Sequence, residues 1–276
     1  MNFLAQFSGP GPAFTYTCII RLFCVALLLT ALEFLNIIAQ FGKGGIYSWK
    51  IIKLNIHPNI LKLKPDLFFN KTGVSVIFST RLACSIYLFI HPISPATPYL
   101  LGAIVLTALI LSIRIPIGSD GSDQMSTIIA VSLFIAFLCH DPKIAAISLY
   151  FIAAQSVISY VIAGSAKLLS KKWRNGTAVY QIMNTESFGS ESISAYLHRS
   201  PPVIATIMSW NVMLFETIFF TVVILPYPYF LIFLIWGIVF HFYNAIIMGL
   251  NNFFWVFLST YPAIIYCNIV LHNYFS

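Results

Sequence analysis

The chain has 276 residues, of which 59% are hydrophobic and only 8% are charged, and its mean hydropathy is +0.88. Soluble domains carry roughly a quarter charged residues, so this composition excludes an ordinary soluble protein and indicates a polytopic membrane protein. The formal charge of +7 does not indicate nucleic-acid binding, because most cations lie between apolar runs and no nucleic-acid-binding motif accompanies them.

A transmembrane helix needs about 20 mostly apolar residues, and about eight stretches reach or approach that length. They are residues 17–41, 73–92, 97–114, 125–140, 143–167, 203–224, 228–249 and 252–272. The stretch 125–140 is the shortest of these, so seven crossings also fit the pattern. The first stretch follows no basic region and contains no small-residue cleavage site, so we expect a retained helix and not a signal peptide.

We therefore expect an all-α fold, a polytopic membrane helix bundle of about eight transmembrane helices. We expect one integral membrane domain over residues 1–276, with two long stretches outside the spans. In residues 43–72, lysines alternate with Trp, Ile and Leu, and Pro58 and Pro65 interrupt any long helix. This pattern predicts an interfacial helical segment whose lysines extend to water. The main hydrophilic loop is residues 168–202.

The loop cations collect on one predicted face of the bundle. With eight helices, the loops that share this face are 42–72, 115–124, 168–202 and 250–252, while the opposite loops offer only Lys143. The positive-inside rule makes the crowded face cytoplasmic. Because every long loop lies on the same face, a basic functional surface outside the cytoplasm explains the same distribution.

Polar groups inside hydrocarbon are costly, and each one marks a candidate site. At 3.6 residues per turn, one face of the helix predicted over 143–167 carries Ser156, Tyr160, Gly164 and Lys167. Gly164 allows a close approach of a partner helix or substrate, Tyr160 can hand over a proton, and a desolvated Lys167 can act as a base. The alternative for Lys167 is a helix-end anchor that snorkels to the interface, and spacing alone favours this anchor.

A second polar stripe lies in the predicted helix 228–249. It consists of Gly237, His241, Asn244, Met248 and Asn251, which fall on one face over four turns. The imidazole either fixes helix packing through hydrogen bonds or handles a proton or substrate. No second His or Cys lies at metal-ligand spacing, so we expect no metal site.

Glu216 lies deep in the apolar stretch 203–224. A carboxylate there is either protonated or paired with a cation. The candidate partners are Arg21, Arg81, Lys167 and His241. Arg21 and Arg81 lie about one turn inside predicted helix ends, where they can also snorkel or meet an anionic group on a substrate or lipid.

Two acidic residues precede the fourth apolar stretch. Asp123 can cap the helix that follows, because Ser or Asp before an apolar run is a start signal. A divalent-ion site formed with Asp120 is the alternative, but two carboxylates without further oxygen ligands favour capping.

Several of these elements together resemble the HTTM (horizontally transferred transmembrane) superfamily, which includes vitamin K-dependent γ-carboxylase. The similarity lies in the sequence Tyr160-Val-Ile-Ala-Gly164-Ser-Ala-Lys167-Leu, followed by Trp173 and Gly176-Thr-Ala178. It continues with Gly-Ser-Asp-Gln before the fourth helix, Glu216 in the sixth, and His241 leading to Gly249-Leu-Asn-Asn-Phe253. Within the superfamily, the compact length and the run KKWRNGTAVYQIMNTESFG most resemble the SdpB family. Those bacterial proteins assist the maturation of an antimicrobial peptide of the sporulation-delaying-protein type.

The resemblance implies a role for Lys167, which occupies the position of the lysine base that deprotonates vitamin K hydroquinone in the carboxylase. The loop that corresponds to a Trp-Asn-Asn-His element of the carboxylase reads GSDGSDQM here and has no His. The soluble portion that binds the carboxylase's propeptide has no counterpart in these 276 residues. Both differences argue against glutamate carboxylation. The carboxylase's active face is lumenal, which would place the long loops outside the cytoplasm.

From the resemblance we expect a multi-pass protein of the bacterial inner membrane that helps to mature or produce a secreted peptide toxin. The expected catalytic residues are Lys167, acting as a base, its charge partner Glu216, Tyr160 and His241. The expected substrate-binding residues are Arg21, Arg81, Trp173, Gly176, Asn244 and Asn251.

The resemblance also implies partners and leaves alternatives open. The expected partners are membrane lipids, the toxin precursor contacted by the 168–202 loop, and a second maturation subunit, because the chain has no protease motif. A quinone is a cofactor by resemblance only. The alternatives are a quinone-dependent, carboxylase-like enzyme and a non-enzymatic toxin transporter or immunity protein.

Overall fold

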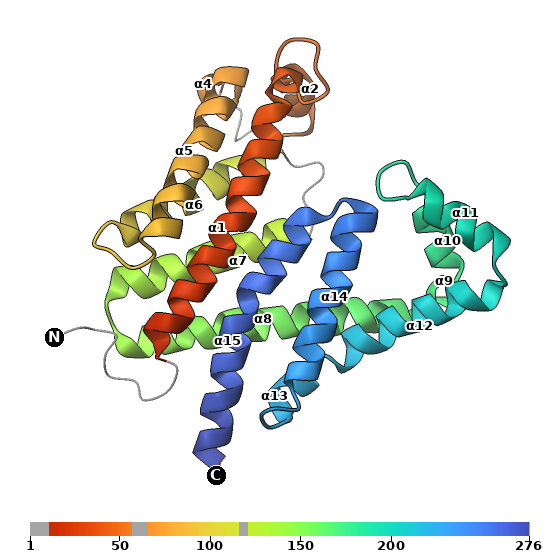
Figure 1. The fold of residues 1–276 in the computed structure, drawn as a ribbon. Coiled ribbons are helices and arrows are strands. Elements are labelled where there is room, and N and C mark those ends of the chain that lie inside the picture. The colour runs from red at the N-terminus through yellow and green to blue at the C-terminus, as the bar shows by residue number, and fades with distance from the viewer. Residues whose placement is uncertain (1–10, 57–65, 116–120, 276) are drawn as a thin grey trace. The chain divides into compact units, whose positions relative to one another are not determined.

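The computed structural model describes residues 11–56, 66–115 and 121–275 (Figure 1). Every regular element in these ranges is a helix, which confirms the all-α class. Seven of the described helices are long and apolar enough to cross a membrane. They are α1 (Pro12–Asn36), α5 (Lys71–Ile90), α6 (Thr97–Arg114), α7 (Gly121–Cys139), α8 (Pro142–Leu169), α14 (Leu231–Met248) and α15 (Asn251–Phe275). The fold is that of a multi-pass helical membrane protein.

The stretch 125–140 is the shortest of the eight predicted transmembrane stretches, but the helix that it forms is long enough to cross a membrane. That stretch belongs to α7, which has 19 residues because it begins at Gly121. Asp123 therefore lies in the first turn of α7 and not at its N-cap, and Asp120 lies outside the described residues.

The stretch 203–224 is instead divided. It forms α12 (Pro202–Ile218) and, after a break, the single turn α13 (Thr221–Ile224). The 17 residues of α12 rise about 25 Å, which is less than the roughly 30 Å of a hydrocarbon core. The break lies at Phe219 and Phe220, and α13 ends at Ile224 because Pro226 disfavours a helical Leu225.

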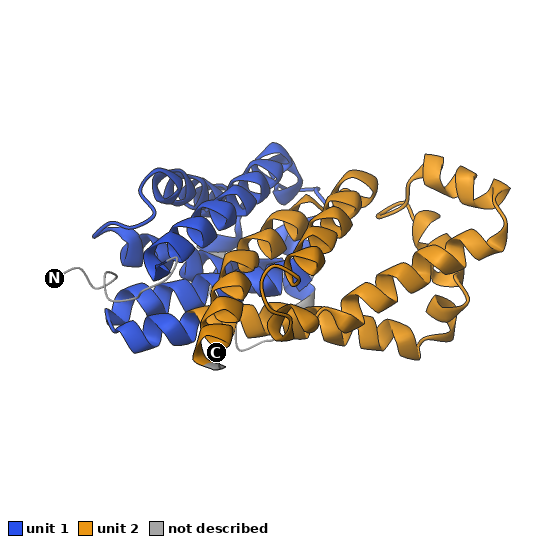
Figure 2. Cartoon of the chain, turned by 60° about the horizontal axis from the view of Figure 1, so that its bottom comes forward, with its two compact units in different colours: residues 1–148 blue, residues 149–276 orange. Residues whose placement is uncertain are grey.

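The chain divides into two compact units, residues 1–148 and 149–276, with the boundary inside α8 (Figure 2). In the first unit, α1 packs along α5, α5 along α6, and α6 along α7. The start of α8 is tied to this unit by the Tyr16 hydroxyl, which donates to the Ala145 carbonyl at 2.6 Å. The single domain expected over residues 1–276 stays a prediction.

The expected interfacial segment, residues 43–72, is helical in short pieces. These are α2 (Trp49–Ile52), the 3₁₀ turn η2 (Lys53–Asn55) and α4 (Asp66–Phe69), preceded by the 3₁₀ turn η1 (Ile38–Phe41). Trp49, Ile52 and Phe69 are buried together, whereas Ile51, Leu54 and Phe68 are exposed, so the segment has both a buried and an exposed apolar side. Pro58 and Pro65 lie outside the described residues.

One arginine ties this segment to the end of α6. Arg114 is fully buried, and it donates from Nε to the Phe69 carbonyl at 2.9 Å and from Nη2 to the Tyr47 carbonyl at 2.5 Å. Its guanidinium also lies 5.1 Å from the ring centre of Phe41 and 5.6 Å from that of Trp49. A planar group with several donors can bind two carbonyls and two rings at once, which an ammonium cannot do.

In the second unit, the hydrophilic loop 168–202 is folded. It contains α9 (Lys171–Arg174), α10 (Thr177–Met183) and α11 (Glu191–Arg199). These helices enclose a small apolar cluster of Val179, Met183 and Leu197, closed by Ala205 of α12. The long helices α14 and α15 pack against each other, and α13 packs against α15.

The outer surface of α14 is apolar. Its exposed side chains include Ile232, Ile235, Val239 and Ile246, each about three-fifths accessible. Large aliphatic side chains in such a row are unfavourable in water and suit a lipid environment. Lipid contact is therefore a direct consequence of the sequence of α14.

The role of Arg114 predicts an asymmetry between two conservative variants. Arg114→Lys keeps the charge but leaves at least one buried carbonyl without a donor, so we expect a loss of about 1–3 kcal/mol in the free energy of unfolding. Arg21→Lys is the control, because Arg21 is exposed and its Nε bond to the Phe89 carbonyl is 3.3 Å long. Unfolding of both variants in detergent, followed by circular dichroism, checks this. Equal stability of the two variants would contradict it.

Candidate functional site

The face of α8 predicted from helical spacing is the face that packs inside the second unit. Ser156 Oγ lies 2.8 Å from Thr260 Oγ1 of α15. The next three positions on this face, Tyr160, Gly164 and Lys167, contact α14, α15 and α12, as the following paragraphs describe. The prediction that these four residues share one face of a helix is therefore confirmed, and the helix that carries them is α8.

Lys167 and Glu216 form an ion pair. Lys167 Nζ lies 2.7 Å from Glu216 Oε1 and 2.5 Å from Oε2, so the ammonium contacts both carboxylate oxygens. The lysine side chain is 22% exposed and the glutamate side chain 6%. Of the four cations considered for Glu216, the partner is therefore Lys167. Lys167 is not simply an anchor that extends away from the protein.

A close contact between two helices makes this pair possible. A Cβ added to Gly164 would lie 2.5 Å from the backbone nitrogen of Thr217 and 2.8 Å from Glu216 Cβ. Real Cβ atoms do not approach other atoms so closely, so only glycine lets α12 approach α8 at this level. The glycine one turn before Lys167 thus places Glu216 beside the ammonium, as the sequence predicted for a partner helix.

The chain after Lys167 folds back over α12. The ring centre of Trp173 lies 5.3 Å from Lys167 Nζ, a cation–π distance. The Trp173 carbonyl accepts a hydrogen bond from Ser209, and the Arg174 carbonyl accepts one from Trp210 Nε1 at 3.1 Å. These bonds hold the indole in place beside the ion pair.

Gly176 has a conformational reason for its place in this loop. Its φ is +78°, a region that glycine adopts without strain. A Cβ there would also lie 2.6 Å from the backbone nitrogen of Thr206 on α12. Trp173 and Gly176 therefore shape the loop that lies against the site, while the cations Lys171 and Lys172 are exposed.

A second cluster lies two helical turns earlier on α8. Tyr160 Oη is 2.6 Å from His241 Nε2 of α14 and 3.1 Å from Tyr261 Oη of α15. The three side chains are 3%, 5% and 4% exposed. Their surroundings are aromatic, since the Tyr160 ring centre is 3.9 Å from that of Phe219 and His241 stacks on Phe257 at 4.9 Å.

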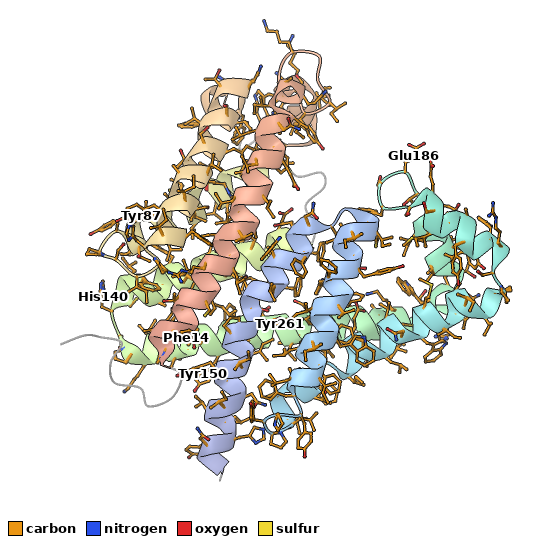
Figure 3. The ribbon with its side chains drawn as sticks, viewed as in Figure 1. Phe14, Tyr87, His140, Tyr150, Glu186 and Tyr261 are labelled. Carbon is orange, nitrogen blue, oxygen red and sulfur yellow. The ribbon has the colours of Figure 1, made fainter. Side chains whose placement is uncertain are left out.

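The sequence identified two members of this cluster and missed the third. Tyr160 and His241 stood out as polar groups at helical spacing in apolar runs. Tyr261, labelled in Figure 3 on α15, lies in a run that already contains several aromatic residues. A tyrosine in such a run has the same pattern as a membrane-interface aromatic, so nothing in the sequence marked its hydroxyl.

The remaining predicted residues lie elsewhere. Arg21 donates to the Phe89 carbonyl, and Arg81 is buried on α5; both residues belong to the first unit. Asn244 is half-buried on α14, one turn after His241.

The predicted stripe does not extend to Asn251. The helix α14 ends at Met248, because Gly249 adopts a left-handed conformation with φ +70°. Asn251 is instead the first residue of α15 and is exposed, so its predicted place on the His241 face is wrong.

The arrangement offers two kinds of chemistry. The ion pair supplies a positive charge and a carboxylate in surroundings with little water, where electrostatic interactions are strong. The Tyr160–His241 contact joins a proton donor to an acceptor. Among the described residues, no three His, Cys, Asp or Glu side chains gather in a way that could hold a metal ion.

Comparisons of the chain with protein-family models, with curated proteins and with solved structures find no match. The class of protein is defined by the fold, a multi-pass helical membrane protein, with a buried polar centre in its second unit. Any more specific function follows from the residues of that centre.

The ion pair predicts an energetic coupling between Lys167 and Glu216. Glu216→Gln leaves a half-buried ammonium without its counter-charge, and we expect it to lower the free energy of unfolding by about 2–4 kcal/mol. In the double variant Lys167→Met/Glu216→Gln the loss should be smaller than the sum of the two single losses. Unfolding titrations in mixed micelles measure this coupling. Glu186→Gln is the matched control, because Glu186 is exposed between α10 and α11 (Figure 3). Additive single losses would contradict the coupling.

The close helix contact makes a separate prediction. Gly164→Ala forces α8 and α12 apart, and we expect it to cost about 1–3 kcal/mol of stability through overpacking. Gly102→Ala on α6 is the control, since a Cβ there would meet only the edge of the Phe134 ring at 3.1 Å. Thermal unfolding of the two variants compares them. A Gly164→Ala protein as stable as Gly102→Ala would show that the contact with α12 is loose.

Proposed function

We propose that this chain is a bacterial inner-membrane protein of the HTTM type, most similar to the SdpB family, that takes part in the maturation of a secreted antimicrobial peptide toxin. The observation that carries the proposal is the Lys167–Glu216 ion pair. In this pair, Lys167 is the lysine of the AG-x-x-KL element, and Glu216 is the buried carboxylate that also belongs to the residues that carry the resemblance. A charged pair in apolar surroundings is costly to maintain, which is why it points to a functional centre.

The state of the pair determines what Lys167 can do. As an ammonium, it stabilises negative charge that develops on a substrate oxygen, such as a peptide carbonyl. As a base, it must first give up a proton, and the nearest acceptor is Glu216 at 2.5 Å. Glu216 therefore serves as charge partner in the first state and as proton acceptor in the second.

The site has an open side. Lys167 keeps 22% of its side chain accessible, and Trp173 lies against it at the start of the folded 168–202 region. A peptide that reaches the lysine would pass this region, whose exposed cations include Lys171 and Lys172. Contact between the precursor and residues 168–202 is thus part of the proposal.

The sequence carries no protease motif. We therefore include a second maturation subunit, which cleaves the precursor, in the proposal.

The proposal predicts the behaviour of Lys167→Ala in cells. We expect a small secreted precursor to be encoded beside this gene, and co-expression in a bacterial host to release mature toxin. Lys167→Ala should lower the mature toxin by about 100-fold or more, as expected for the loss of a charge that stabilises a reacting group. Mass spectrometry of the culture medium measures the toxin, and an immunoblot of membranes confirms insertion of the variant.

Lys143→Ala is the matched control, because Lys143 is exposed at the other end of α8, outside residues 168–202, and should tolerate the change. Normal toxin release by an inserted Lys167→Ala protein would rule out the role of the lysine. Protection of sensitive cells by this chain alone, without any effect on precursor processing, would instead assign it to immunity.

A further inference from the structure

Tyr261 is a buried hydroxyl to which neither the resemblance nor the proposed function assigns a role. It lies on α15 (Figure 3), and its Oη is 3.1 Å from Tyr160 Oη, which in turn is 2.6 Å from His241 Nε2. Three helices thus contribute one polar group each to a continuous chain of hydrogen bonds. Because the side chains are almost fully buried, each proton that lacks an acceptor within this chain of hydrogen bonds is costly.

The protons can be ordered in two ways that use both contacts. In the first, Tyr261 donates to Tyr160, and Tyr160 donates to His241 Nε2. The imidazole then carries its proton on Nδ1, so both hydroxyl protons have acceptors. His241 Nδ1 has no partner among the described residues, so only its N–H is left without one.

In the second order, His241 Nε2 donates to Tyr160, and Tyr160 donates to Tyr261. The Tyr261 proton then has no acceptor in the chain, and Nδ1 holds an unused lone pair. This order leaves two buried groups unsatisfied, whereas the first leaves one. Each unsatisfied buried group costs about 1–3 kcal/mol, so the first order is favoured.

Two geometric details agree with the first order. The 2.6 Å contact between Tyr160 and His241 is short, as hydrogen bonds donated by a hydroxyl are. A hydroxyl that accepts a hydrogen bond also becomes a stronger donor, so donation by Tyr261 strengthens the bond from Tyr160 to His241.

The helix opposite Tyr261 is shaped to receive its hydroxyl. Gly237 lies on α14 one turn before His241, and a Cβ at this position would collide with Tyr261 Oη. The same Cβ would lie 3.4 Å from the Phe215 ring, an ordinary contact. The steric reason for glycine here is therefore the hydroxyl of Tyr261 and not the packing of the two helices in general.

We propose that Tyr261 is a positioning residue that directs the Tyr160 proton toward His241 Nε2. Tyr160 donates this proton to Nε2 and keeps its O–H bond, and the hydrogen bond that it accepts from Tyr261 polarises that O–H bond toward the imidazole. The use of this proton in toxin maturation rests on the proposed function, whereas the direction of the hydrogen bonds can be measured without any toxin.

The test is nitrogen NMR of the purified full chain labelled with ¹⁵N-histidine. The signal of His241, one of 6 histidines, is assigned by its loss in His241→Gln. In the unsubstituted protein we expect a neutral imidazole with the proton on Nδ1 and an unprotonated, hydrogen-bonded Nε2. In Tyr261→Phe the Nε2 resonance should shift toward that of a nitrogen accepting a weaker hydrogen bond.

Two further variants make the result specific. Gly237→Ala, which displaces the Tyr261 hydroxyl, should shift Nε2 in the same direction. Tyr266→Phe removes the hydroxyl of another buried tyrosine on α15 and should leave the resonance in place. A proton on Nε2 in the unsubstituted protein would overturn the proposal. A shift in Tyr261→Phe no larger than that in Tyr266→Phe would overturn it as well. Neither outcome bears on whether Lys167 is needed for toxin maturation.

Discussion

The contact between Lys167 and Glu216 constrains much of the second unit. A carboxylate inside an apolar helix bundle needs a counter-charge, and the lysine that supplies it stands at the last turn of α8. For the two groups to meet, α12 must lie against α8, and only glycine at position 164 permits that distance. The indole of Trp173 then lies over the ammonium, because the chain after α8 is bonded to α12 through the Trp173 and Arg174 carbonyls. The positions of helix, loop and ring thus follow from one buried charge.

The second cluster depends on α8 in the same way but is fixed by hydrogen bonds. Tyr160 lies seven residues before Lys167, which is about 10 Å along the helix axis. The cluster has three members, Tyr160, His241 and Tyr261, and in the described structure Tyr160 is the one that bonds to both others. One helix therefore carries a charged pair and a neutral hydrogen-bonded cluster, about 10 Å apart along its axis.

Helical spacing was sufficient to predict the inner face of α8. Polar groups that recur every three or four residues in an apolar run lie on one side of the helix, and within a membrane that side faces the protein interior. The sequence also identified Glu216 as a residue in need of a partner, but a sequence gives no distances and so could not choose among four cations. Tyr261 escaped prediction because its hydroxyl is polar only at the tip of an aromatic ring that suits a membrane. Asn251 was misplaced because the left-handed Gly249 ends α14. The length of α7 and the break after Ile218 depended on where helices start and stop, which hydropathy describes poorly.

The separation of the ion pair along the chain has a consequence for how the protein enters the membrane. Glu216 is synthesised 49 residues after Lys167, so the whole of α8 is made before its counter-charge exists. During that interval the ammonium can remain solvated, since it lies at the last turn of the helix, close enough to the lipid headgroups to extend toward them. The carboxylate arrives later in a helix too short to span the hydrocarbon on its own. Lys167 on the already synthesised α8 is thus available as a binding partner for α12 when the carboxylate of Glu216 is made.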